Sequence, residues 1–190
     1  MKILTAHTTT APSDALLSFL HSKNVRTTIQ VLFASLFIGL CAQIRIPLFF
    51  TPVPLTGQTF AVILVGALLG SRKGAFAALC YLVEGAAGMP VWAGGSAGLL
   101  NLLGPTGGYL FLYPLQAFFI GYCLEKLSFN FFKIFAIFSL LCCIQLALGS
   151  LWLGYFVGFS NCFAMGFIPF INIELFKTFF LTAYLKHRRS

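Results

Sequence analysis

Two charged residues stand inside an otherwise apolar stretch near the end of the chain. Glu174 and Lys177 are three positions apart, so in a helix they share one face and are close enough to pair. A charged group at membrane depth costs about 2.5–3.5 kcal/mol on insertion scales, and such residues usually face the bundle interior and mark a substrate or ion path. The spacing predicts either a ligand site or a self-neutralising contact that closes the bundle.

Other polar groups within apolar stretches are weaker candidates. Glu84 follows Tyr81 by about one helical turn, and it is either an acceptor in a pocket or a hydrated carboxylate at the membrane interface. Glutamines in membrane helices more often join helices by hydrogen bonds than bind ligands. Among them Gln58 has the best case, because it borders a segment rich in Pro and Gly.

Several classes of chemistry are excluded by the residues present. The three histidines lie in the polar ends, and the six cysteines form no CxxC pair, so no metal site or other cofactor is predicted. There is no GxxxxGK[ST], HExxH or GxSxG motif. A membrane-embedded enzyme that uses Glu174, Lys177 or Glu84 as acid and base is disfavoured, because no nucleophile accompanies them. We expect no catalytic residue and no enzyme activity.

The composition indicates the setting of these groups. Of the 190 residues, 59% are hydrophobic and 8% are charged, against about 45–50% and 25% in soluble domains. So few charges cannot cover a soluble surface, and disorder would require the opposite balance. The net charge of +8 is scattered along the chain rather than gathered on one face, which argues against a nucleic-acid partner. The chain is predicted to be a small all-α integral membrane protein.

Six apolar stretches are expected to form transmembrane helices, four of them short for a full span. Short segments rich in Gly and Pro tend to line a cavity, where unpaired backbone is tolerated. Because Pro169 precedes the last stretch, we expect that helix to begin near Asn172. The stretches are 27–46, 58–70, 74–89, 109–124, 134–157 and 172–186.

The positive charges predict the orientation. Ten of the twelve Lys and Arg residues fall in the two ends and the connections after the second and fourth stretches, which places both termini in the cytoplasm. We expect a cytoplasmic segment 1–26 without a cleavable signal, a six-helix binding domain 27–186 and a basic tail 187–190. The remaining cations are Lys177 and Arg45, whose long side chain could reach the interface at the outer end of the first span.

The outer connections, 47–57 and 90–108, are uncharged and rich in Gly and Pro. Glycine backbone can approach a ligand closely, and the apolar side chains in 90–108 favour a packed lid over a flexible loop. In the first span, Ser35 and Gly39 form a small-xxx-small pair that serves either internal packing or the docking of a partner helix.

Four segments together resemble the BioY family, the biotin-specific substrate-binding (S) components of energy-coupling-factor (ECF) transporters. They are TPVPLTGQTFAVILVGALLGSRKG (51–74), YLVEGAAGMPVWAGG (81–95), GPTGGYL (104–110) and FIPFINIELFK (167–177). The chain departs from the family pattern at Glu174, where Asp is usual, and at Ile173, Trp92 and Glu84. These departures bear on specificity, so an S component for another vitamin is the alternative.

The resemblance implies an S-component fold with an outward-facing biotin pocket capped by the two outer connections. It implies that Glu174 and Lys177 contact biotin, and we infer that Lys177 suits its carboxylate and Glu174 its ureido N–H groups. It implies uptake across a bacterial plasma membrane, alone or with an ECF coupling protein that docks on Ser35 and Gly39 and is driven by two ATPase subunits. The other expected biotin contacts are Gln58, Tyr81, Trp92, Gly94, Gly95, Gly107, Gly108 and Tyr109.

Overall fold

The computed structural model describes residues 22–189, so the expected segment 1–26 lies mostly outside the described residues. Each apolar stretch predicted from the sequence coincides with a helix. The six long helices are α2 Lys23–Gln43, α3 Gln58–Leu69, α4 Ser71–Ala86, α6 Gly107–Lys126, α7 Phe131–Val157 and α9 Ile168–Arg189. The short elements are β1 Arg45–Ile46, β2 Leu55–Thr56, η1 Ala93–Gly95, α5 Leu99–Leu102 and α8 Cys162–Gly166.

Three local predictions are corrected. The first stretch was expected to remain helical to 46, but α2 ends at Gln43, and residues 45–46 form β1, which pairs antiparallel with β2. Apart from this small ladder and a single bridge between Trp92 and Ser96, the regular structure of the described chain is helical. The start of α9 near Asn172 was also wrong: the helix begins at Ile168, because Pro169 occupies the first turn, where its missing N–H has no intrahelical partner to lose. Finally, α4 begins at Ser71 instead of 74, directly after Gly70 turns the chain at a positive φ of 84°.

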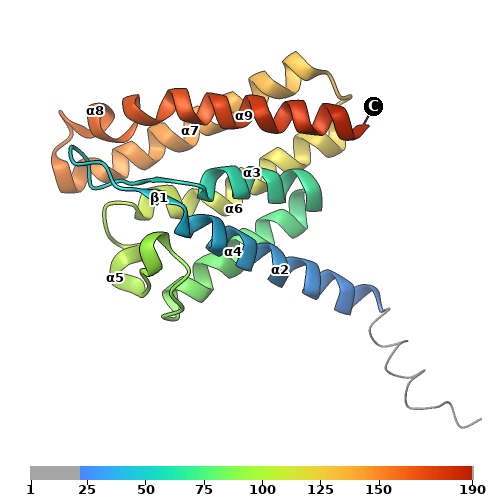
Figure 1. The fold of residues 1–190 in the computed structure, drawn as a ribbon, viewed down its shortest axis with the longest axis horizontal. Coiled ribbons are helices and arrows are strands. Elements are labelled where there is room, and N and C mark those ends of the chain that lie inside the picture. Colours follow the sequence, from blue (N-terminus) through green and yellow to red (C-terminus); the bar gives the residue numbers. More distant parts are fainter. Residues whose placement is uncertain (1–21, 190) are drawn as a thin grey trace, which may run out of the picture.

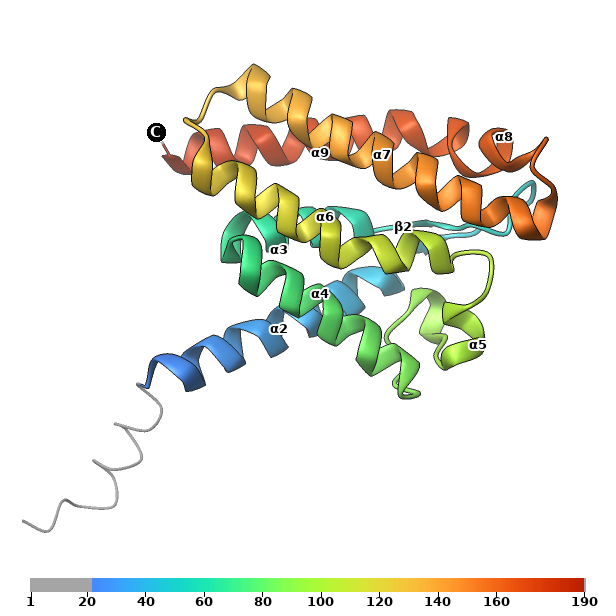
Figure 2. The ribbon, with the colours of Figure 1, turned by 180° about the vertical axis from the view of Figure 1, so that it is seen from behind.

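Helix α6 is the centre of the bundle and contacts α3, α4 and α7 (Figures 1 and 2). One apolar cluster joins α2, α3, α4 and α6, and a second joins α3, α6, α7 and α9. Glycines allow the closest approaches within these clusters. A Cβ on Gly66 of α3 would lie 2.5 Å from the carbonyl oxygen of Ala117 on α6.

The outer surface is apolar as well, with Phe33 and Tyr155 74% and 77% exposed. Exposed apolar area of this kind requires a lipid surrounding rather than water. Four helices are long and apolar enough to cross a membrane by length and composition, while α3 is a shorter apolar helix. The protein is therefore a multi-pass membrane protein, and the count of six spans stays a prediction.

The elements divide between two ends of the molecule. The start of α2, the turn between α3 and α4, the α6–α7 connection and the end of α9 lie at one end, which we call the terminal end (Figures 1 and 2). The opposite end, the loop end, holds β1, β2, α5 and α8. The predicted basic connections all lie at the terminal end, and the two outer connections at the loop end.

Candidate functional site

A cavity of about 430 Å³ lies at the loop end. Its walls come from both outer connections and from α3, α6, α7 and α9. The volume falls within the usual 300–1,000 Å³ range of small-molecule sites. Its lining is mixed, with apolar side chains such as Leu48, Trp92 and Phe170 beside a few polar groups, which is the composition typical of a ligand pocket.

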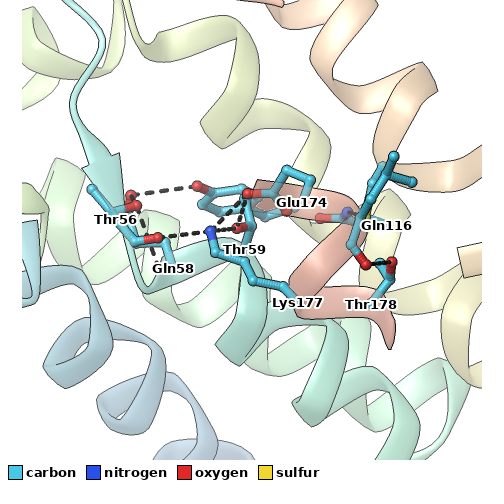
Figure 3. Close-up of polar contacts among 10 residues, drawn as sticks. Thr56, Gln58, Thr59, Gln116, Glu174, Lys177 and Thr178 are labelled. Carbon is cyan, nitrogen blue, oxygen red and sulfur yellow. Dashed lines mark hydrogen bonds and ion pairs between the residues drawn. The ribbon is translucent and has the colours of Figure 1, made fainter. Parts of the chain in front are cut away.

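Glu174 and Lys177 meet in the cavity wall as the sequence predicts. The Lys177 ammonium lies 2.7 Å from Glu174 Oε1, and Figure 3 shows it directed toward Glu174 and Thr59. The same ammonium donates to Thr59 Oγ1 at 2.7 Å and to the Thr56 carbonyl at 2.9 Å. The Thr59 hydroxyl donates to Glu174 Oε1 at 2.7 Å. The pair thus fixes α9 to β2 and to the start of α3.

Lys177 and Glu174 differ in how many of their hydrogen-bonding groups are already paired. A lysine ammonium has three N–H donors, and all three of Lys177 are engaged. Glu174 is 4% exposed, and its Oε2 has no hydrogen-bond partner among the described residues. An unpaired buried carboxylate oxygen costs about 1–3 kcal/mol or more. Glu174 lines the cavity but holds an acceptor that the described residues do not use, and a ligand N–H that reached this buried oxygen would satisfy it.

A second polar network lies beside the pair and centres on Gln58 (Figure 3). Its Oε1 accepts from Thr56 Oγ1 at 3.0 Å and from the Tyr113 hydroxyl at 3.4 Å, and its Nε2 donates to the Tyr81 hydroxyl. Gln58 and Tyr113 line the cavity, while Tyr81 is fully buried behind them. The network fixes the Gln58 amide in one orientation.

The wall from α6 and the lid from 91–95 are each fixed by hydrogen bonds. The Tyr109 ring lines the cavity, while its hydroxyl donates to the Gly166 carbonyl at 2.9 Å. Gln43 connects the lid to α2: its Nε2 donates to the Trp92 carbonyl at 3.2 Å, and its Oε1 accepts from the Gly95 N–H at 3.0 Å.

Among residues 22–189, no group of His, Cys, Asp and Glu side chains could hold a metal ion.

Several known proteins are similar to this chain. The BioY family model matches residues 10–190. A "Probable biotin transporter BioY" of Pyrococcus horikoshii is 38% identical over 78% of this chain and 88% of the relative. The "Biotin transporter BioY" of Thermotoga maritima is 39% identical over 78% and 88%, respectively. The chain belongs to the BioY family. The resemblance inferred from four sequence segments is thereby confirmed.

A solved structure is also similar to this BioY chain. It is the crystal structure of the S-component for biotin from an ECF-type ABC transporter, with a TM-score of 0.75 and 28% identity. The match covers 88% of this chain and 94% of that one. The fold is therefore that of an S component.

Of the four glycines predicted from the BioY resemblance, Gly94, Gly107 and Gly108 lie close against other parts of the protein. Gly107 and Gly108 face the Leu102 carbonyl and the Trp152 side chain, so any Cβ there would collide. Gly94 lies against the Arg45 guanidinium, and the Gly95 N–H is held by Gln43. In the described chain the cavity wall does not include these four glycines. Their role as ligand contacts stays a prediction.

The Ser35 and Gly39 pair on α2 makes contacts within the protein. Ser35 is fully buried and donates to Glu84 Oε1 on α4 at 2.7 Å. A Cβ on Gly39 would contact Val91 at 3.2 Å. Internal packing therefore accounts for both residues, and the docking of a partner helix on them stays a prediction.

Sequence reasoning missed Thr56, Thr59, Tyr113 and Gln43. All four act through contacts between elements distant in sequence: Thr59 reaches Lys177 across 118 positions, and Gln43 reaches Trp92 across 49. Such contacts leave no spacing pattern. Thr56 and Thr59 flank Gln58, and that proximity was the only available signal.

Proposed function

We propose that this BioY protein is a membrane biotin uptake protein that binds biotin in the loop-end cavity and translocates it without covalent chemistry. The observation that carries the proposal is the buried, unpaired Oε2 of Glu174, a residue that lines the cavity of about 430 Å³. The ureido ring of biotin carries two N–H donors, and a carboxylate is a strong acceptor for them. The names of the relatives, biotin transporters in each case, support transport rather than catalysis.

The remaining lining suits the rest of the molecule. Apolar side chains such as Leu48, Val53 and Trp92 would surround the thiophane ring and the valerate methylenes. Burial of each methylene contributes about 0.8 kcal/mol. The connections 47–57 and 90–108, which both supply lining residues, would cap the bound ligand.

Titration calorimetry on the detergent-solubilised protein tests the proposal, with thiamin and riboflavin as controls. We expect one-to-one binding of biotin and no heat from either control. Binding of another vitamin in place of biotin would favour the alternative, an S component of different specificity. Such a result would direct attention to Glu174, Ile173 and Trp92, where the chain departs from the family pattern.

The membrane arrangement that we propose has six spans with both termini in the cytoplasm of a bacterial plasma membrane. It is supported by the charges at the terminal end, where Lys23, Arg26, Arg72 and Lys73 lie with the cations of the α6–α7 connection and of the end of α9. Cytoplasmic loops carry such an excess of Lys and Arg. The cavity at the loop end would then open to the outside.

Partner subunits belong to the proposal as well. The similar structure is a component of an ECF-type ABC transporter, which supports assembly with a transmembrane coupling protein and two ATPase subunits. Uptake by the chain alone is the other possibility. Comparing biotin uptake into cells that express the chain with and without an ECF module separates the two.

Gln43 is expected to control the residence time of the ligand. Gln43→Ala removes the bonds that join α2 to Trp92 and Gly95, so the lid should open more often. We expect the biotin dissociation rate to rise about tenfold, as follows from losing one or two hydrogen bonds of about 1 kcal/mol each. Stopped-flow displacement of a fluorescent biotin conjugate measures the rate. Gln30→Ala, at the other end of α2, is the matched control, and an equal rate in both variants would contradict the lid role.

A further inference from the structure

The charges in the cavity wall do not balance. The charged residues that line it are Arg45, Lys177 and Glu174, two cations and one carboxylate, which leaves a formal charge of +1. Lys177 and Glu174 neutralise each other at 2.7 Å. The unbalanced charge therefore resides on Arg45, and a ligand with one negative charge would complete the site.

Arg45 has a defined place in the fold. It lies on β1, where it pairs with Thr56 of β2, and its side chain extends over Gly94 of η1. A Cβ on Gly94 would lie 2.0 Å from the Arg45 Nη1 atom, so a side chain there would displace the guanidinium from this position, and the positive φ of 71° at Gly94 favours glycine as well. No hydrogen bond or ion pair joins the Arg45 side chain to another of residues 22–189. Its five N–H donors are therefore available.

The two basic groups approach the cavity from different sides. In both views the β1–β2 pair lies between α9 and the segment that contains α5 (Figures 1 and 2). Lys177 reaches the pair from α9 and donates to the Thr56 carbonyl. The Arg45 guanidinium lies on the other side, against η1, which precedes α5. A ligand that reaches from Glu174, which is paired with Lys177, to Arg45 needs an N–H group at one end and an anion at the other.

We propose that Arg45 binds the carboxylate of the ligand and thereby orients it, with the ureido ring toward Glu174 and the valerate toward the 90–108 connection. The inference rests on the proposed function and deepens it. It replaces Lys177 as the carboxylate partner, because the three donors of Lys177 are already engaged. Guanidinium and carboxylate match each other as two parallel hydrogen bonds.

A phosphate of a lipid headgroup is the other anion within the reach of an exposed arginine at a membrane interface. A ligand carboxylate and a lipid phosphate, as the anion bound by Arg45, predict different effects of replacing Arg45 on ligand affinity. If Arg45 binds the ligand, its contribution depends on the ligand's own charge. If Arg45 binds lipid, its replacement affects charged and neutral ligands alike.

The experiment measures the affinities of biotin and biotinamide for the wild-type chain, Arg45→Gln and Arg72→Gln. Biotinamide retains the ureido and thiophane rings and lacks the charge. Arg72 is an exposed arginine at the terminal end and serves as the matched control. We expect the wild type and Arg72→Gln to bind biotin at least about tenfold more tightly than biotinamide. Arg45→Gln should bind both equally, at the wild-type affinity for the amide.

Two outcomes overturn the inference while the proposed function stands. Arg45→Gln would retain the preference for biotin over its amide if the carboxylate lies elsewhere. It would weaken both ligands equally if Arg45 supports the loop or binds lipid. Failure of the folded wild type to bind either ligand would instead overturn the proposed function, so the two failures are distinguishable.

Discussion

Replacing Lys177 by Met should lower the affinity for biotin by about a hundredfold or more. The substitution leaves Glu174, which is 4% exposed, without its counter-charge, and breaking a buried ion pair from one side costs about 3–5 kcal/mol. It also removes the donor to the Thr56 carbonyl and to Thr59 Oγ1, so β2 loses its bond to α9 and only the Thr59–Glu174 bond still joins the start of α3 to α9. Calorimetry gives the affinity, and thermal unfolding in detergent gives the stability.

The double variant Glu174→Leu/Lys177→Met separates stability from binding. Replacing both members of a buried pair with apolar residues is often neutral or stabilising, so the unfolding midpoint should return toward the wild-type value. Biotin binding should be lost, because the acceptor for the ureido N–H groups is gone. Lys133→Met, an exposed lysine at the terminal end, controls for loss of a positive charge. Biotin binding by the double variant would remove Glu174 from the site.

The central pair of the site could be predicted from sequence because its signal is local. Helical spacing places Glu174 and Lys177 on one face, and the cost of burying either charge alone predicts that they pair. The sequence does not show which acceptors the three N–H donors of Lys177 bind. Whether Lys177 retains a free N–H depends on Thr56 and Thr59, which come from the opposite side of the cavity.

The surroundings of Arg45 likewise could not be predicted from the sequence. From sequence it is a cation at the end of an apolar stretch, for which a position at the lipid interface is a sufficient explanation. Its relation to Gly94 arises only when β1 turns the chain away from α2 and the 90–108 connection folds beneath it. At Gly94, Gly107 and Gly108 the groups that approach closely in the described chain belong to the protein, and contact with a ligand stays a prediction.

The fold was predictable where apolar periodicity and charge agree. Helices α2, α6 and α7 begin or end within a few residues of the predicted bounds, because polar residues and Gly or Pro interrupt the apolar runs there. The predicted helix start was wrong at α9, where the apolar run and a proline indicate different first residues. Pro169 suggested a later start for α9, yet proline is compatible with a first helical turn.

A methyl group added at Gly66 should destabilise the fold, because it would meet the backbone of another helix. In Gly66→Ala the new Cβ would lie 2.5 Å from the Ala117 carbonyl oxygen and 2.9 Å from its Cα. Both atoms belong to the α6 backbone, which cannot rotate aside, so α3 and α6 must separate. Overpacking of this kind costs about 1–3 kcal/mol, occasionally more. The unfolding midpoint should fall, and biotin should bind more weakly because α3 carries Gln58 and Thr59.

Gly39→Ala provides the matched comparison, since it adds the same methyl group to a buried helical glycine. There the nearest atom is the Val91 Cβ at 3.2 Å, a side chain on a connection that can move by a few tenths of an ångström. Alanine also favours a helix over glycine by about 0.5–1 kcal/mol, which offsets the contact. Gly39→Ala should therefore unfold near the wild-type temperature while Gly66→Ala does not. Equal losses in the two variants would mean that the α3–α6 contact is no tighter than the rest of the bundle.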